Sequence, residues 1–127
     1  MYDHLLVRTR ARALSFLSHV DERHVGTRSS RSALIAALGG PLPDNPADAI
    51  AVIEHLAGAA DPGLVACAGP RYFGFVTGGS YPVSVAADWL VSAWDQNAAF
   101  HLMSPAAAVV HEVPAGWVLE VVGLAAR

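Results

Sequence analysis

The feature that most restricts how this chain can fold is a long segment almost without charge. Between Ala51 and Trp117 only six residues carry a formal charge, namely Glu54, Asp61, Arg71, Asp88, Asp95 and Glu112. So few charges cannot cover the surface of a segment of this length, so it is either buried in something larger or presents an apolar face to a partner. We therefore expect an incomplete or obligately oligomeric piece. An ordinary alanine-rich helical domain is the alternative.

The remaining composition excludes several classes of function. The net charge of −3 offers no electrostatic basis for binding nucleic acid. Cys67 is the only cysteine, so there is neither a disulfide framework nor a thiolate metal site. The six histidines form no pair at i, i+4 spacing and no HExxH motif, and we expect no bound metal. Neither a signal peptide nor a membrane-spanning segment is recognisable, which predicts a cytoplasmic protein without a membrane partner.

Capping residues, prolines and glycines predict a mainly α-helical chain. A serine at 29 or 30 can cap a short helix that Gly39-Gly40 ends. Asn45-Pro46 and Ser104-Pro105 each combine a capping side chain with a first-turn proline. The expected helices cover residues 3–20, 30–38, 46–60, 82–98 and 105–122.

Pro114 conflicts with the last of these helices. A proline in a helix interior removes a backbone hydrogen bond and clashes with the preceding turn, at a cost of about 3 kcal/mol. We therefore expect a kink or a break at this residue.

The stretch between the third and fourth expected helices lacks a helical pattern. Residues 71–77 are aromatic and β-branched and are interrupted by Gly74, which is typical of an extended segment or a loop. Gly78-Gly79 follow directly, and they indicate a turn that needs a positive φ or a close approach to a ligand.

Four short pieces occur in a fixed order within this region. They are Pro-Arg-Tyr-Phe-Gly-Phe at 70–75, Gly-Gly-Ser-Tyr-Pro at 78–82, Ala-Asp-Trp-Leu at 87–90, and Asp-Gln-Asn at 95–97 followed by Ser-Pro-Ala at 104–106. Each piece is weak alone. Together, at this spacing, they resemble the group II pyridoxal-phosphate-dependent decarboxylases, the family of the glutamate and aromatic amino acid decarboxylases, and its bacterial members in particular. The similarity is strongest over 69–113 and looser over 31–62.

The resemblance implies the N-terminal part of an α/β enzyme with the pyridoxal-phosphate transferase fold, type I. Such an enzyme is a carboxy-lyase that acts on an L-amino acid as a homodimer. Residues 1–68 would form a helical N-terminal extension that packs against its counterpart in the dimer. Residues 69–127 would begin the decarboxylase domain, with a substrate-side loop and two helices that precede the cofactor core.

The resemblance also implies which residues face the substrate. Thr77 matches a threonine that approaches the substrate's carboxylate. Phe75 and Val76 would form an apolar wall of the substrate site. A hydroxyl donor among apolar neighbours suits an α-carboxylate, because CO2 is lost more easily from a water-poor site. A second turn would reach the neighbouring subunit's active site, through Gln96, Asn97, Ala99 and Phe100. As the alternative, Thr77 fills an extended segment and the second turn only ends a helix.

The basic residues conflict with catalysis by this chain alone. All eight are arginines, so these 127 residues contain no lysine. A pyridoxal phosphate decarboxylase holds its cofactor as a Schiff base on a lysine amine. The resemblance thus implies pyridoxal phosphate for the complete enzyme, while this chain is expected neither to hold it covalently nor to decarboxylate. The chain also departs from the family at His111, where glutamate is usual, and at Pro114.

Two other classes of function stay open. The chain is either a helical dimerisation or interaction module, or a remnant, without catalysis, which the low charge over 51–117 favours. Or it is an unrelated small-molecule-binding protein with a pocket around Phe73, Phe75 and Trp94.

Overall fold

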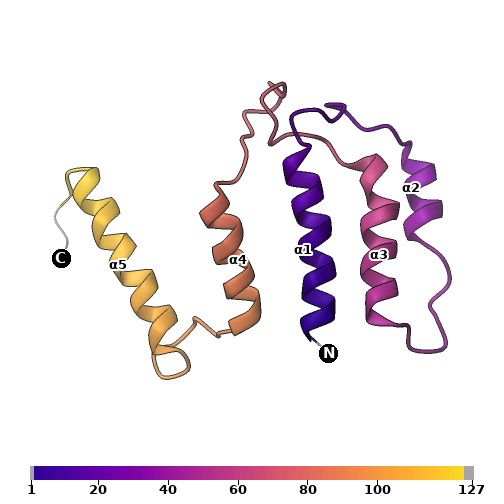
Figure 1. Ribbon diagram of the computed structural model, residues 1–127. Helices are drawn as coiled ribbons and strands as arrows, with labels where there is room; N and C mark the ends of the chain where they lie inside the picture. Colours follow the sequence, from indigo (N-terminus) through magenta and orange to yellow (C-terminus); the bar gives the residue numbers. More distant parts are fainter. Residues whose placement is uncertain (1, 125–127) are drawn as a thin grey trace. The chain divides into compact units, whose positions relative to one another are not determined.

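A computed structural model describes residues 2–124 (Figure 1). Helices make up 57% of the chain, and residues 2–124 contain no strand, so the predicted mainly α-helical class is confirmed. The contacts divide the chain into two units, Met1–Gly79 and Ser80–Arg127. Residues 125–127, the end of the predicted second domain, lie outside the described part.

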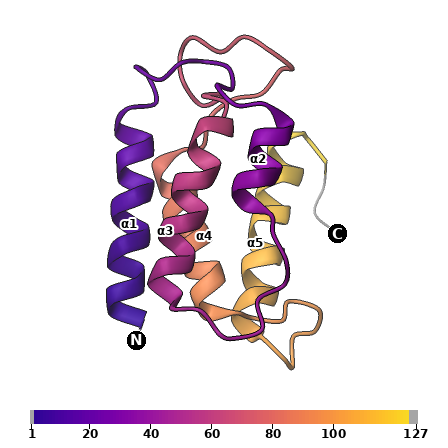
Figure 2. The ribbon, with the colours of Figure 1, turned by 90° about the vertical axis from the view of Figure 1, so that its right-hand side faces the viewer.

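The first unit contains three helices, α1 (Tyr2–Ser18), α2 (Arg31–Leu38) and α3 (Ala49–Ala60), and then a short 3-10 helix, η1 (Asp61–Gly63). Helix α3 contacts both α1 and α2 and lies between them in both views (Figures 1 and 2). The half-buried side chains of α3 recur every three or four residues, as the helical period requires. This period is followed by Ile50, Ile53, Ala57 and Ala60, and Glu54 and Ala59 are half-buried as well.

Side-chain caps decide where α2 and α3 begin. The Ser30 hydroxyl accepts a hydrogen bond from the Ala33 amide, as predicted. The Asp48 carboxylate accepts one from the Ala51 amide at 2.9 Å, so α3 begins at Ala49. The prediction that Asn45-Pro46 starts this helix is therefore wrong. Aspartate caps a helix as well as asparagine does, and its negative charge also interacts favourably with the helix N-terminus.

An ion pair joins α1 to α3. The Arg12 guanidinium donates to the Glu54 carboxylate, with Nε at 2.8 Å from Oε2. This hydrogen bond and the positive charge of Arg12 lower the pKa of Glu54, and Glu54 in turn raises the pKa of Arg12. The pair is partly exposed and supplements the apolar contact between the two helices.

The Arg12–Glu54 pair makes the stability of the first unit depend on pH. A carboxyl group with a depressed pKa contributes stability above its unfolded-state pKa and loses it as the pH falls through its folded-state pKa. We expect Glu54→Gln to lower the urea midpoint at neutral pH and to match the unmodified protein in acid. Urea titrations of both proteins at about pH 7 and about pH 3 measure this. Glu22→Gln is the control, because the Glu22 side chain is in no described ion pair. If the urea midpoint of Glu54→Gln stays below that of the unmodified protein in acid, the prediction is contradicted.

The second unit contains α4 (Pro82–Trp94) and α5 (Pro105–Val121), which diverge from the loop that joins them (Figure 1). Both helices begin with a proline, and the Ser104 hydroxyl caps α5 by accepting from the Ala107 amide, as predicted. Helix α4 ends at Trp94 and not near residue 98, because Asp95 adopts a left-handed conformation with φ 46°. Aspartate is among the residues that tolerate this conformation.

Helix α5 runs through Pro114 without interruption, so the predicted break is wrong. The missing amide of Pro114 leaves the Val110 carbonyl without its helical donor. Val110 is 69% exposed, so solvent can reach this part of the helix and satisfy the carbonyl group. The turns on both sides then maintain the helix.

Few side chains are buried in either unit. Among residues 2–124 only Ala66 and Ser104 are buried, and no helix contains a buried residue. The accessible surface is 10606 Å². A compact monomer of this mass exposes about 6,500 Å², and two separate globules the size of these units expose about 7,700 Å². Each unit by itself therefore leaves large apolar side chains exposed.

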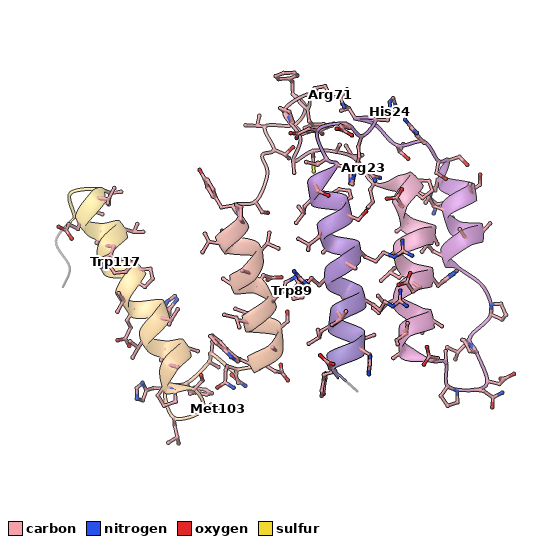
Figure 3. All side chains as sticks on the ribbon, in the orientation of Figure 1. Arg23, His24, Arg71, Trp89, Met103 and Trp117 are labelled. Atoms are coloured by element: carbon pink, nitrogen blue, oxygen red, sulfur yellow. The ribbon has the colours of Figure 1, made fainter. Side chains whose placement is uncertain are left out.

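Four of the exposed apolar side chains of α5 form a continuous stripe, while Val109 and Val118 are exposed on other faces. Its members recur every three or four residues along one face and are all exposed. Trp117, the largest, is 64% exposed and projects from the helix (Figure 3). This α5 stripe consists of Val110, Val113, Trp117 and Val121.

Candidate functional site

The predicted substrate-side residues Phe75, Val76 and Thr77 lie in the loop that follows η1. Phe75 and Val76 both have left-handed backbones, with φ of 55° and 54°. The Thr77 amide donates to the Gly74 carbonyl at 3.4 Å and closes a turn around them. Two successive left-handed residues are typical of a type I′ turn, which prefers Asn-Gly. We call Phe75 and Val76 the loop tip.

The loop tip is strained and gains no packing from this conformation. A left-handed backbone costs an L-residue about 1–2 kcal/mol, and it is most unusual for a β-branched residue such as valine. Phe75 is 91% and Val76 106% exposed, so neither side chain is covered. Strained backbone concentrates at binding and catalytic sites, where function maintains it. The loop tip is therefore the strongest candidate for a binding element in the first unit.

Of the two alternatives expected for Gly78-Gly79, the positive φ is wrong, because it occurs at the loop tip instead. A Cβ at Gly79 would lie 3.2 Å from the Ala68 carbonyl oxygen, so Gly79 allows two backbone segments to approach closely. Gly78 has open space around it.

Thr77 is exposed, and its hydroxyl donates to the Gly74 carbonyl at 3.3 Å. This bond is long, so a stronger acceptor such as a carboxylate can compete for the same proton. Thr77 directly follows the turn, and its side chain is exposed.

The second predicted turn belongs to the second unit and is held by its own hydrogen bonds. The Asn97 side-chain oxygen accepts from the Ala99 amide at 3.0 Å. The Phe100 carbonyl accepts from the amides of Met103 and Ser104, and the Phe100 side chain is 66% exposed. The candidate residues thus form two groups in different units, each described by itself.

Gln96 has a structural role that the sequence only partly indicated. Its side-chain nitrogen donates to the Trp94 carbonyl at 2.7 Å, and its side-chain oxygen accepts from the Ser104 hydroxyl at 3.0 Å. Ser104 is 1% exposed and also caps α5. The pair connects the end of α4 to the start of α5. Sequence patterns identified Ser104 as a cap but not its partner, because the intervening loop conformation brings them together.

Pyridoxal phosphate does not fit the residues of this chain. No lysine is present to form the Schiff base. The loop tip is open to solvent and encloses nothing. Phe73, Phe75 and Trp94, the residues of the alternative ligand pocket, are also largely exposed and line none of the pockets described for either unit.

The described residues contain neither a metal-binding cluster nor a membrane-spanning helix. Among residues 2–124, no three His, Cys, Asp or Glu side chains come close enough together to hold a metal ion. None of the helices in this range has the length and apolar character needed to cross a membrane.

Comparisons with protein-family models, with curated proteins and with solved structures find no match to this chain.

Proposed function

We propose that this chain is the substrate-side and association segment of a pyridoxal-phosphate-dependent amino acid decarboxylase of fold type I. It acts only together with a polypeptide that supplies the Schiff-base lysine. The observation that carries the proposal is the loop tip, where Phe75 and Val76 are strained and uncovered next to Thr77. The family resemblance assigns these three residues, together with Asn97, Ala99 and Phe100 of the second turn, to the substrate side.

Each of these residues has a separate task in the proposed site. The Thr77 hydroxyl donates a hydrogen bond to the substrate carboxylate and orients it. Phe75 and Val76 cover that carboxylate and exclude water, which favours the loss of CO2. The cofactor supplies the electron sink when it is bound elsewhere in the complete enzyme.

A second copy of the chain covers the exposed apolar surface in this proposal. The surface exceeds that of two separate globules by about 2,900 Å², which is enough for an obligate homodimer interface. The α5 stripe provides the helical face that such an interface buries. The proposed enzyme is therefore a homodimer, and the loop around Asn97, Ala99 and Phe100 contacts the neighbouring active site.

The test of the catalytic proposal begins with the DNA that follows the codon for Arg127. We expect a reading frame that contains a lysine in the family's cofactor motif. In the enzyme that includes it, Thr77→Val should lower kcat/KM for CO2 release from the preferred L-amino acid about 10- to 100-fold, the loss of one hydrogen bond to a charged group. Thr9→Val is the matched control, because the Thr9 hydroxyl only bonds the Leu5 carbonyl within α1. Equal activities of the two variants would remove Thr77 from the substrate side.

The isolated chain should show no absorbance near about 420 nm after addition of pyridoxal phosphate, and borohydride should fix no cofactor to it. A stable internal aldimine would contradict the proposed division of roles.

The exposed α5 stripe also favours a second function, a helical association module without catalysis. This function is favoured over the decarboxylase if no reading frame with the lysine follows and the 127-residue chain forms a stable dimer.

A further inference from the structure

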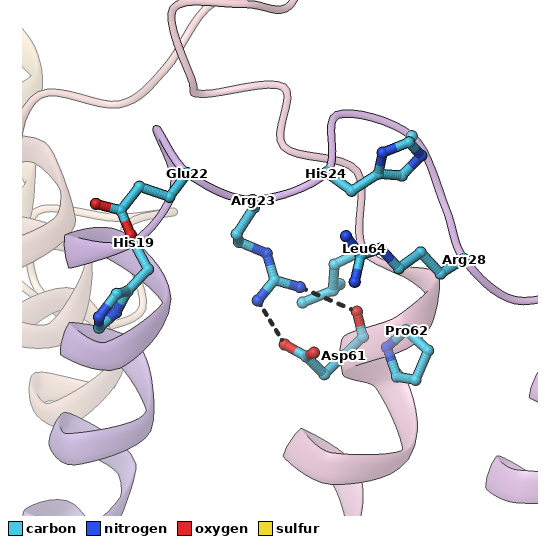
Figure 4. A pocket seen from close by; sticks show the side chains of 9 residues that line it. His19, Glu22, Arg23, His24, Arg28, Asp61, Pro62 and Leu64 are labelled. Atoms are coloured by element: carbon cyan, nitrogen blue, oxygen red, sulfur yellow. Dashed lines mark hydrogen bonds and ion pairs between the residues drawn. The ribbon is translucent and has the colours of Figure 1, made fainter.

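A polar pocket of about 260 Å³ lies in the first unit, where the segment after α1 crosses η1 (Figure 4). Backbone hydrogen bonds hold that segment in place. The Arg28 amide donates to the Pro62 carbonyl at 2.8 Å, and the Ala66 amide donates to the Val25 carbonyl at 3.0 Å. The Thr27 hydroxyl donates to the same Pro62 carbonyl at 3.1 Å. The pocket therefore has a wall that does not depend on flexible side chains.

One arginine of the pocket is already fully engaged. The Arg23 guanidinium forms an ion pair with the Asp61 carboxylate at 2.9 Å and donates a hydrogen bond to the Asp61 carbonyl at 3.1 Å. It also lies over the Phe16 ring, 4.8 Å from the ring centroid. Arg71 donates to the Arg23 carbonyl at 2.6 Å, and Arg23, His24 and Arg71 gather at the same end of the unit (Figure 3). Arg23 is thus a fixed positive group whose charge Asp61 balances.

The second arginine, Arg28, has no such partner. It lines the same pocket and makes no side-chain hydrogen bond or ion pair within residues 2–124. Its guanidinium points to the part of the pocket that holds the Arg23 guanidinium (Figure 4). Glu22, the other carboxylate of the pocket besides Asp61, points away from Arg28 toward His19 (Figure 4). Two guanidinium groups therefore lie in one pocket, and among the described residues only that of Arg23 is paired with a carboxylate.

We infer that this pocket binds a small oxyanion, the phosphate or carboxylate group of a small molecule, through Arg28. The planar guanidinium fork bonds such a group with two parallel N–H donors. Arg23 adds positive potential from a fixed position, and His24 contributes a further donor at the rim. The binding site lies apart from the loop tip and does not depend on the proposed decarboxylase function.

Binding should be weak, with a dissociation constant on the order of millimolar, because exposed charge pairs contribute little. Phosphorus NMR of inorganic phosphate, titrated with the full chain at constant ionic strength, measures it directly. We expect saturable line broadening. Arg28→Gln should raise the dissociation constant by up to about 5-fold, and this substitution keeps the backbone bond from residue 28 to Pro62. Glu22→Gln should lower the constant, since it removes a negative charge from the pocket.

Arg10→Gln is the matched control, because Arg10 is exposed on α1 and does not line this pocket. Equal loss in Arg10→Gln and Arg28→Gln, or broadening that never saturates, would overturn the inference. Acetate competition separates the two ligand sources. Displacement of phosphate by acetate identifies a general oxyanion site, and its failure identifies a phosphate site.

Discussion

Trp117→Asp should convert a self-associating chain into a monomer. Trp117 is the largest member of the α5 stripe and is 64% exposed in the single chain. Large aromatic residues near the centre of an interface cost 2 kcal/mol or more when they are lost, which corresponds to an increase of about 30-fold or more in the dissociation constant. A buried unpaired carboxylate adds to that cost. Sedimentation velocity over a concentration series from about 1 to about 100 µM measures the change.

His111→Asp is the matched control for this experiment. It introduces the same charge into the same helix, but residue 111 lies off the α5 stripe by the helical period. We expect it to leave the association unchanged. If the unmodified chain is a monomer over the whole series, or if both variants weaken association equally, the α5 stripe is not the interface.

Pro114→Ala should stabilise the second unit by up to about 3 kcal/mol. The substitution restores an amide that can donate to the Val110 carbonyl, and it replaces the least favourable helix residue by the most favourable one. The full gain corresponds to a rise in Tm of up to about 30 °C for a unit of this size. Thermal unfolding followed by circular dichroism measures it.

The matched control is Pro105→Ala in the same helix. Pro105 is the first residue of α5, where the missing amide needs no partner and the fixed φ suits the helix. We expect this substitution to be close to neutral. If the two substitutions have equal effects on Tm, the interior proline does not strain α5.

The local chemistry of single residues made most of the helices predictable. Ser30 and Ser104 cap their helices because a hydroxyl reaches the third amide wherever the chain leaves an extended conformation. The start of α3 was misplaced because two good caps, Asn45 and Asp48, compete within four residues, and their propensities do not separate them.

The candidate site was predictable only as a set of residue types. Its loop was expected from the glycines, but the positive φ falls on Phe75 and Val76, against the preferences of both residues. Arg28 carried no motif, since its importance comes from sharing a pocket with Arg23 of the same segment and with Asp61 of η1, which lies far from it in sequence. These residues share a pocket only because the segment after α1 crosses η1.

The sequence by itself determined a charge-poor, mainly helical chain without lysine, because helix period, capping and composition are local properties. Only the tertiary structure decided which apolar faces remain uncovered. The α5 stripe has the same period as the inner face of α3, yet α3 packs between two helices and the stripe does not pack within its unit. An apolar helix face is buried only where another element packs against it, and the arrangement of the elements in space decides which element that is.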